Sequence, residues 1–165
     1  MEQKHIISTL VQNKPGVLAH VAGMFAARAF NIDSLTVGRT EDPSLSRMTI
    51  VVIGDDRVVE QVRKQLAKII SVVKVQDFAG RDVVIRDLML ISVATPPEKR
   101  SEILALIEMF KGKVVDIGPK FVMVEIAGPE NKIEAFINAC RPYGVKNVVR
   151  TGTVAMARYG RKQVD

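Results

Sequence analysis

Apolar residues fall along the chain in short runs rich in Val, Ile, Leu and Thr, and in segments with a helical period. In the first half, the runs predict four strands, at residues 5–12, 31–37, 48–53 and 72–77. Apolar residues recurring every three to four positions predict two amphipathic helices, at residues 17–28 and 58–69. The predicted order of elements is therefore βαββαβ.

The second half repeats this order. Strands are predicted at residues 88–94, 113–117, 121–127 and 145–149, the last with Val154 as its farthest limit, and helices around residues 96–110 and 129–140. At the first of these helices, Thr95 and Glu98 have the spacing of a capping box, and Pro96 suits the first helical position. The repetition predicts an α+β fold of two tandem ferredoxin-like domains, each an antiparallel sheet with helices on one face.

A stretch without periodicity, Phe78 to Asp82, separates the two halves. We therefore predict a first domain at residues 1–78, a linker at 79–85 and a second domain at 86–165. Because domains of about 80 residues bury only modest cores, mutual packing or oligomerisation is expected.

Composition narrows the class of protein. No apolar run approaches the roughly 20 residues that a membrane span requires. The N-terminus lacks the pattern of a signal peptide, and a single cysteine cannot form an internal disulfide. We expect a cytoplasmic protein that does not bind a membrane.

The net charge of +6 raises the question of nucleic acid. Part of it lies in the C-terminal residues Arg158, Arg161 and Lys162, where a solvated end is favoured over a nucleic-acid arm. RNA-binding domains share the βαββαβ order but place aromatic residues on central strands, and neither the first strand nor residues 47–53 contains one. No nucleic-acid partner is expected.

Catalytic and metal-binding groupings are scarce, and we predict no catalytic residue and no metal ligand. His5 and His20 have no partners at metal-ligand spacing and are interpreted as surface residues. Cys140 shares an apolar helix face and is interpreted as a core side chain. A ferredoxin-like catalyst using Asp33, Asp116 or Cys140 remains the least favoured alternative.

The loop between the first strand and the first helix, Asn13 to Leu18, is the best candidate for a binding site. Its helix start offers unpaired amide protons to a carboxylate, and Gly16 permits close approach. The side chains of Asn13 and Asn31 can accept from an ammonium group, while Val17, Leu18 and Ile32 suit an apolar side chain. An ordinary capped helix start is the alternative, and the residues alone favour it.

The double βαββαβ order and the sequence Asn13-Lys14-Pro15-Gly16-Val17-Leu18 resemble the ACT domain, a regulatory module that binds amino acids. Longer stretches resemble the small, regulatory subunit of acetolactate synthase (acetohydroxyacid synthase), from about Ile6 to about Arg158. These stretches are residues 30–37, 45–50, 111–116 and 150–156.

The resemblance implies a non-catalytic subunit that activates a separate catalytic subunit and makes it sensitive to valine. It implies that thiamine diphosphate, Mg²⁺ and FAD are bound by that catalytic subunit, with no cofactor on this chain. It also implies a homodimer through the ACT domains, with valine bound between two chains. The implied effector-binding residues are Asn13, Lys14, Pro15, Gly16, Val17 and Leu18 of one chain and Asn31 and Ile32 of the other.

The contact with the catalytic subunit, the identity of the effector and the regulated target are further questions that the resemblance raises. The loop Arg39 to Arg47 would face the catalytic subunit, with a solvated hairpin as the alternative. The effector could be valine, leucine or isoleucine. The leading rival function is an ACT–ACT protein that senses an amino acid and regulates a different target.

Overall fold

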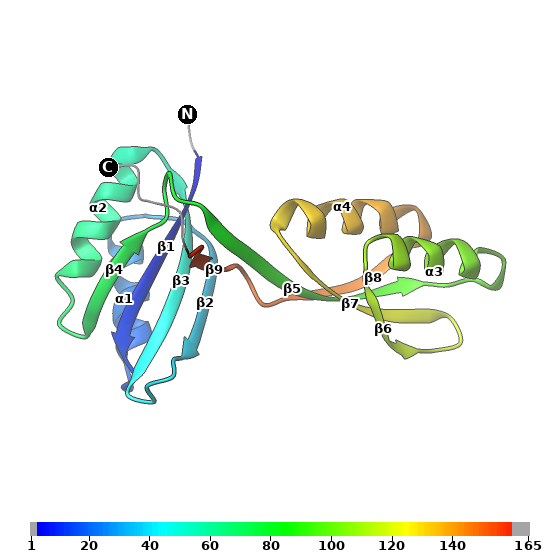
Figure 1. The fold of residues 1–165 in the computed structure, drawn as a ribbon, viewed down its shortest axis with the longest axis horizontal. Helices are drawn as coiled ribbons and strands as arrows, with labels where there is room; N and C mark the ends of the chain where they lie inside the picture. Colours follow the sequence, from blue (N-terminus) through cyan, green and yellow to red (C-terminus); the bar gives the residue numbers. More distant parts are fainter. Residues whose placement is uncertain (1–2, 160–165) are drawn as a thin grey trace. The chain divides into compact units, whose positions relative to one another are not determined.

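The computed structural model describes residues 3–159, which form two compact units. Unit 1 contains residues 3–84 together with residues 153–159, and unit 2 contains residues 85–152. Figure 1 shows the elements of each unit. Within the described residues, no helix has the length and apolar character that a bilayer crossing requires.

Unit 1 is an antiparallel sheet of strand order β2-β3-β1-β4 with two helices on one face. Its elements are β1 (Gln3–Gln12), α1 (Val17–Ala27), β2 (Ile32–Arg39), β3 (Leu45–Gly54), α2 (Asp56–Ala67) and β4 (Val72–Asp77). Helix α2 begins at an N-cap, Asp55, whose carboxylate accepts from the amide of Val58 at 2.9 Å.

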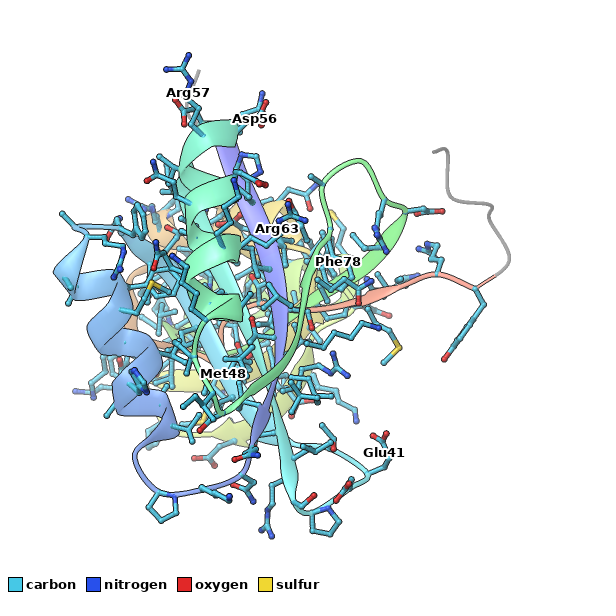
Figure 2. All side chains as sticks on the ribbon, turned by 90° about the vertical axis from the view of Figure 1, so that its left-hand side faces the viewer. Glu41, Met48, Asp56, Arg57, Arg63 and Phe78 are labelled. Carbon is cyan, nitrogen blue, oxygen red and sulfur yellow. The ribbon has the colours of Figure 1, made fainter. Side chains whose placement is uncertain are left out.

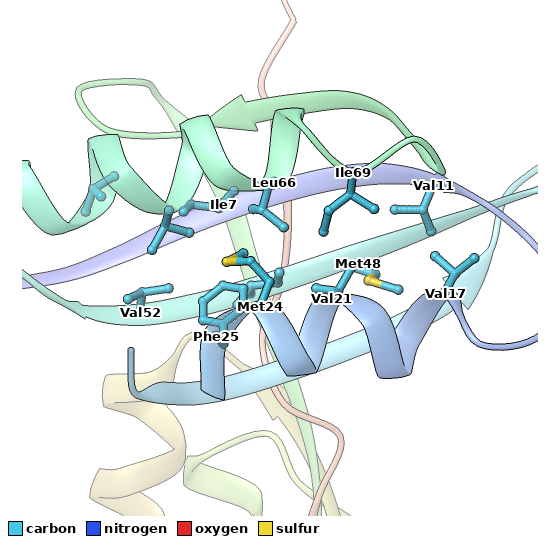
Figure 3. Packing of buried hydrophobic residues seen from close by; sticks show 13 residues of the cluster. Ile7, Val11, Val17, Val21, Met24, Phe25, Met48, Val52, Leu66 and Ile69 are labelled. Carbon is cyan, nitrogen blue, oxygen red and sulfur yellow. The ribbon is translucent and has the colours of Figure 1, made fainter. Parts of the chain in front are cut away.

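The core of unit 1 lies between this sheet and its helices (Figure 3). Alternate residues of each central strand point toward the helices, as the period of two in a strand requires. Ile7 of β1 and Met48 of β3 therefore pack against Phe25 of α1 and Leu66 of α2, and all four are at most 1% exposed.

Unit 2 repeats the architecture with strand order β6-β7-β5-β8. Its elements are β5 (Val83–Ala94), η1 (Pro97–Lys99), α3 (Arg100–Met109), β6 (Lys113–Ile117), β7 (Phe121–Gly128), α4 (Glu130–Cys140), η2 (Arg141–Tyr143) and β8 (Val145–Arg150). An edge-to-face pair of Phe110 and Phe136, with ring centroids 5.2 Å apart, lies in its core region.

After β8 the chain passes back to unit 1 and forms β9 (Val154–Ala157), which pairs with β5. The amide of Arg158 donates to the carbonyl of Asp82 at 3.0 Å, and the two side chains form an ion pair. The predicted domain bounds and the observed units thus differ at residues 79–84, predicted to belong to the linker, and at residues 153–159, predicted to belong to the second domain. Both segments group with unit 1.

The predicted fold class, two tandem βαββαβ units with antiparallel sheets, is confirmed. The expectation that His5 is a surface residue is wrong, because His5 shares the inward face of β1 with Ile7 and is 7% exposed. The strand predicted to begin at Leu88 begins at Val83. The basic residues Arg161 and Lys162 lie outside the described residues.

The predicted capping box is also wrong. Thr95 is buried at 2% exposure, and among residues 3–159 its hydroxyl has no hydrogen-bond partner. Its amide donates to the carbonyl of Lys120 at 2.8 Å, which holds Thr95 beside the β6–β7 turn. A short 3₁₀ turn, Pro97–Lys99, then precedes α3, and neither helix start has a side-chain cap.

Candidate functional site

The candidate loop of unit 1 enters α1 at a glycine, Gly16. Its backbone has a conformation that only a residue without a side chain adopts freely. Gly16 has φ of +83° and is the N-cap of α1, with no side-chain cap. A Cβ placed on Gly16 would meet no atom within 4 Å. The space beside this helix start is therefore open.

The side chain of Asn13 is held in one orientation by the loop that joins β2 and β3. Its amide nitrogen Nδ2 donates to the carbonyl of Pro43 at 3.0 Å, and its main-chain amide donates to the carbonyl of Ser44 at 2.7 Å. Because a carbonyl only accepts, Nδ2 must be the atom facing Pro43. The remaining side-chain atom, Oδ1, has no partner within residues 3–159 and can accept from an ammonium group.

The β2–β3 loop is itself ordered by hydrogen bonds around Asp42. One carboxylate oxygen of Asp42 accepts from the hydroxyl of Ser44 at 2.7 Å and from its amide at 2.9 Å. These two bonds lower the pKa of Asp42 below its usual value. The carbonyls that hold Asn13 therefore belong to a fixed turn.

The first turn of α1 supplies main-chain donors. The amide of His20 makes the first helical hydrogen bond, to Gly16 at 2.9 Å, while those of Leu18 and Ala19 donate to no acceptor among the described residues. Such amides and the positive end of the helix dipole attract carboxylates. Leu18 is 45% exposed and available for contact, whereas the side chain of Val17 lies in the core (Figure 3).

Asn31 and Ile32 lie where β2 begins. Asn31 is exposed and makes no hydrogen bond within residues 3–159, and Ile32 is half-buried against the core. Asn31 lines an open pocket of about 620 Å³ together with Ala29, Phe30, Ile53, Gly54, Asp55 and Val58. The remaining predicted residues, Lys14 and Pro15, are exposed in the β1–α1 loop.

Within one chain, these two groups of residues lie at opposite ends of the sheet. The loop at Asn13 follows Gln12, which pairs with Leu45, whereas Ile32 pairs with Val52. Seven residue steps on β3 separate these pairs, which corresponds to about 23 Å. Figure 2 shows the same two ends, with Glu41 of the β2–β3 loop at one and Asp56 of α2 at the other. A single unit 1 therefore does not bring Asn13 and Asn31 together.

The residues considered for catalysis are scattered. Asp33 forms an ion pair with Lys4 at 2.9 Å, and Asp116 accepts from the amide of Ile117 at 2.9 Å. Cys140 is fully buried, and burial raises the pKa of its thiol to about 11. Within residues 3–159, no three His, Cys, Asp or Glu side chains gather as a metal site would require.

Sequence reasoning missed the partners of Asn13. Pro43 and Ser44 contribute main-chain carbonyls, and a carbonyl has no residue-type signal. The only available indication was topological, since the β1–α1 and β2–β3 connections of a βαββαβ unit lie at the same end of its sheet.

Comparisons with known proteins agree with this fold. Residues 7–74 match the model of the acetohydroxyacid synthase (AHAS) small subunit-like ACT domain, and residues 86–159 match the model described as small subunit of acetolactate synthase. The first unit thus places the chain among the ACT-domain proteins. More narrowly, the chain belongs to the family of acetolactate synthase small subunits, as the resemblance of the sequence predicted.

Relatives of similar length support this assignment. A protein named "Probable acetolactate synthase small subunit" from Archaeoglobus fulgidus is 54% identical over 159 residues, 96% of this chain and 99% of that one. The acetolactate synthase small subunit of Bacillus subtilis is 46% identical over 94% of this chain and 91% of its own length. The crystal structure of the small subunit from Thermotoga maritima matches with a TM-score of 0.90 and 44% identity, covering 96% of this chain and 99% of that one.

Proposed function

We propose that this chain regulates an acetolactate synthase catalytic subunit without performing chemistry itself. In this proposal it raises the activity of that subunit and makes the activity sensitive to valine. The observation that carries the proposal is the division of the candidate site, whose two halves lie at opposite ends of one strand pair. Such a site is complete only when a second copy contributes the missing half.

The sheet of unit 1 has an edge strand that can pair with a second copy of the chain. Strand β2 is the last in the order β2-β3-β1-β4, and among the described residues it pairs only with β3. Antiparallel pairing of two β2 edges would place the start of one β2 beside the end of the other. A two-fold dimer of this kind brings Asn31 of one chain to the loop at Asn13 of its partner, and forms two equal sites.

The groups at this composite site match the parts of an α-amino acid. The free amides of Leu18 and Ala19 would hold the carboxylate, and Oδ1 of Asn13 would accept from the ammonium group. Leu18 and Ile32 would contact the apolar side chain, which favours valine, leucine or isoleucine over polar amino acids.

Inhibition follows if valine binds the inhibited arrangement of the dimer more tightly than the active one. Coupling of this kind is typically worth about 1–3 kcal/mol. The β2–β3 loop, residues 39–47, is the proposed contact with the catalytic subunit. Because Pro43 and Ser44 of this loop hold Asn13, an effector that moves Asn13 also moves the loop.

In this proposal the catalytic subunit binds thiamine diphosphate, Mg²⁺ and FAD. That subunit would join two pyruvates, or pyruvate and 2-oxobutyrate.

The test is acetolactate formation by the catalytic subunit of the same organism, with and without this chain, during titrations of valine, leucine and isoleucine. Stimulation that valine reverses is the expected result. A thermal shift with some other amino acid, without stimulation, would instead support an ACT–ACT sensor with a different target.

Asn31 offers a narrower test. Replacing Asn31 with Ala should weaken valine binding to the purified dimer at least about tenfold, because a hydrogen bond to a charged group contributes about 1.5–3 kcal/mol. Isothermal titration calorimetry measures the change. Asn147→Ala, on exposed strand β8 of unit 2, is the matched control and should leave the dissociation constant unchanged. An unchanged constant in Asn31→Ala would remove Asn31 from the site.

A further inference from the structure

Residues 150–153, here named the junction, are the first part of the stretch 150–156 that resembles the family. They connect unit 2 to the C-terminal segment of unit 1. Arg150, Thr151 and Gly152 belong to unit 2, and Thr153 belongs to unit 1. The other connection between the units, at Val84 and Ile85, lies inside the continuous strand β5. The junction, unlike that strand, contains a residue with positive φ, Gly152 at +93°, at the point where the chain leaves unit 2.

On the unit 1 side, the junction is fixed to β2, the strand that begins beside Asn31. The amide of Thr153 donates to the hydroxyl of Ser34 at 2.9 Å, and the carbonyl of Thr153 accepts from the hydroxyl of Thr36 at 3.1 Å. Ser34 and Thr36 occupy the face of β2 that points away from the helices, because Leu35 between them packs against the core. Figure 1 shows β9 close to β2 in unit 1.

On the unit 2 side, the junction is fixed to β5. The amide of Thr151 donates to the carbonyl of Leu88 at 3.0 Å, and the hydroxyl of Thr151 accepts from the amide of Leu88 at 3.1 Å. Beside it, Nε of Arg150 donates to the carboxylate of Asp87 at 2.7 Å, and Asp87 is 2% exposed. Thr151 and Arg150 are thus held in place by buried or main-chain partners.

We propose that the junction transmits effector binding from β2 of unit 1 to β5 of unit 2, so that both units respond to valine. This inference rests on the proposed function. A hydrogen bond weakens steeply when its atoms move beyond about 3.5 Å, so a shift of β2 by an ångström must be followed by Thr153 or break two bonds. Only Gly152 separates Thr153 from Thr151, so a displacement of Thr153 must be taken up either by the dihedral angles of Gly152 or by the Thr151–Leu88 bonds.

The mechanism assigns a separate role to each group of residues. Asn13, Leu18 and Asn31 determine how tightly valine binds, whereas Ser34 and Thr36 determine whether unit 2 registers the binding. Ser34 and Thr36 are positioning residues, since they act through Thr153 and touch no ligand in this arrangement. Removing their hydroxyls should therefore separate affinity from response, which a purely stabilising role would not do.

The test compares the wild-type chain with the variant Ser34→Ala/Thr36→Val. We expect the valine dissociation constant of the free dimer to change less than twofold. In the complex with the catalytic subunit, the inhibition by saturating valine should fall to about half, because the part that passes through unit 2 is lost and the part that passes through the β2–β3 loop is kept. In the free dimer, valine should alter amide hydrogen exchange at Leu88 at least fivefold in wild type and leave it unaltered in the variant.

A matched control removes the same atoms elsewhere. In Ser71→Ala/Thr95→Val one serine and one threonine hydroxyl are lost, and neither takes part in a hydrogen bond within residues 3–159. This variant should keep both affinity and inhibition.

Each contrary result has a distinct meaning. Full inhibition in Ser34→Ala/Thr36→Val overturns the proposed role of the junction, and so does a dissociation constant that rises in step with the loss of inhibition. A wild-type chain that binds valine but neither stimulates nor inhibits the catalytic subunit overturns the proposed function. The exchange measurement at Leu88 then still decides the role of the junction.

Discussion

The β1–α1 loop of unit 1 and the β5–α3 loop of unit 2 occupy the same place in the same fold and differ in chemistry. In unit 1, Gly16 opens the helix start and leaves amides free. In unit 2, Pro96 and Pro97 have no amide protons, and the amide of Thr95 is used by Lys120. A shared topology therefore supports an anion site only where the local sequence leaves donors exposed.

The two units also differ in where they place charge. In unit 1 the ion pair of Lys4 and Asp33 is largely exposed. In unit 2 the carboxylate of Asp87 is almost completely buried, and Arg150 pairs with it and with Glu134. Burial by itself would lower the pKa of Arg150, but the hydrogen bonds to Asp87 and Glu134 raise it above its usual value. Unit 2 thus contains an ion-pair network built around a buried carboxylate.

The largest expected effect comes from closing the open loop of unit 1. Gly16→Asp should abolish valine inhibition, because a side chain and a negative charge would occupy the place of the effector's carboxylate. The φ of +83° adds a backbone cost of about 1–2 kcal/mol, which circular dichroism melting measures separately. Acetolactate formation over a valine titration measures the inhibition.

Two variants sharpen this result. Gly16→Asn has nearly the same shape, tolerates positive φ and carries no charge, so it should retain weak valine inhibition. Pro97→Asp places the same charge in the corresponding loop of unit 2 and should leave the inhibition unchanged. Normal valine sensitivity in a folded Gly16→Asp complex would contradict the placement of the effector.

The fold was predictable because its signals are local. Strand alternation and helical periodicity identified every α-helix and strand of both βαββαβ units. These patterns depend on the sequence of each segment and not on which strands pair in the sheet. Where prediction failed, a tertiary contact overrode the local pattern. Thr95 and Glu98 have the spacing of a capping box, but the amide of Thr95 is bonded to Lys120 beside the sheet, and α3 begins only at Arg100.

The error at His5 could have been avoided from the sequence. His5 shares its strand face with Ile7 and Val11, so alternation alone indicated that it is buried. The return of residues 153–159 to unit 1 could not be predicted in this way. It depends on hydrogen bonds between residues more than 100 positions apart, such as the bond from the amide of Thr153 to the side-chain hydroxyl of Ser34.

The next largest effect tests the contrast in charge placement. Asp87→Ala should lower the free energy of unfolding by about 2–3 kcal/mol, because Arg150 and Thr151 lose hydrogen bonds to a buried carboxylate, although Arg150 keeps its pair with Glu134. Asp33→Ala, which breaks the exposed pair with Lys4, should lower it by less than about 1 kcal/mol. Urea denaturation gives both values, and amide hydrogen exchange shows which unit is affected. Equal losses in the two variants would remove the distinction between the units.

The smallest expected effect concerns a feature that the two units share. Thr9 in β1 and Thr95 after β5 are both buried, and neither hydroxyl has a partner within residues 3–159. Valine has nearly the shape of threonine without the hydroxyl, and an unpaired buried hydroxyl costs about 1–3 kcal/mol. Thr9→Val and Thr95→Val should therefore each raise the free energy of unfolding by about 1 kcal/mol.

Because Thr9 and Thr95 lie in different units, the two gains should add in the double variant, as they do for distant sites. Thermal unfolding of the single and double variants measures this. A loss of stability in either single variant would mean that its hydroxyl has a hydrogen-bond partner in solution, such as a buried water. Gains that fail to add would show that the units are energetically coupled in the absence of effector.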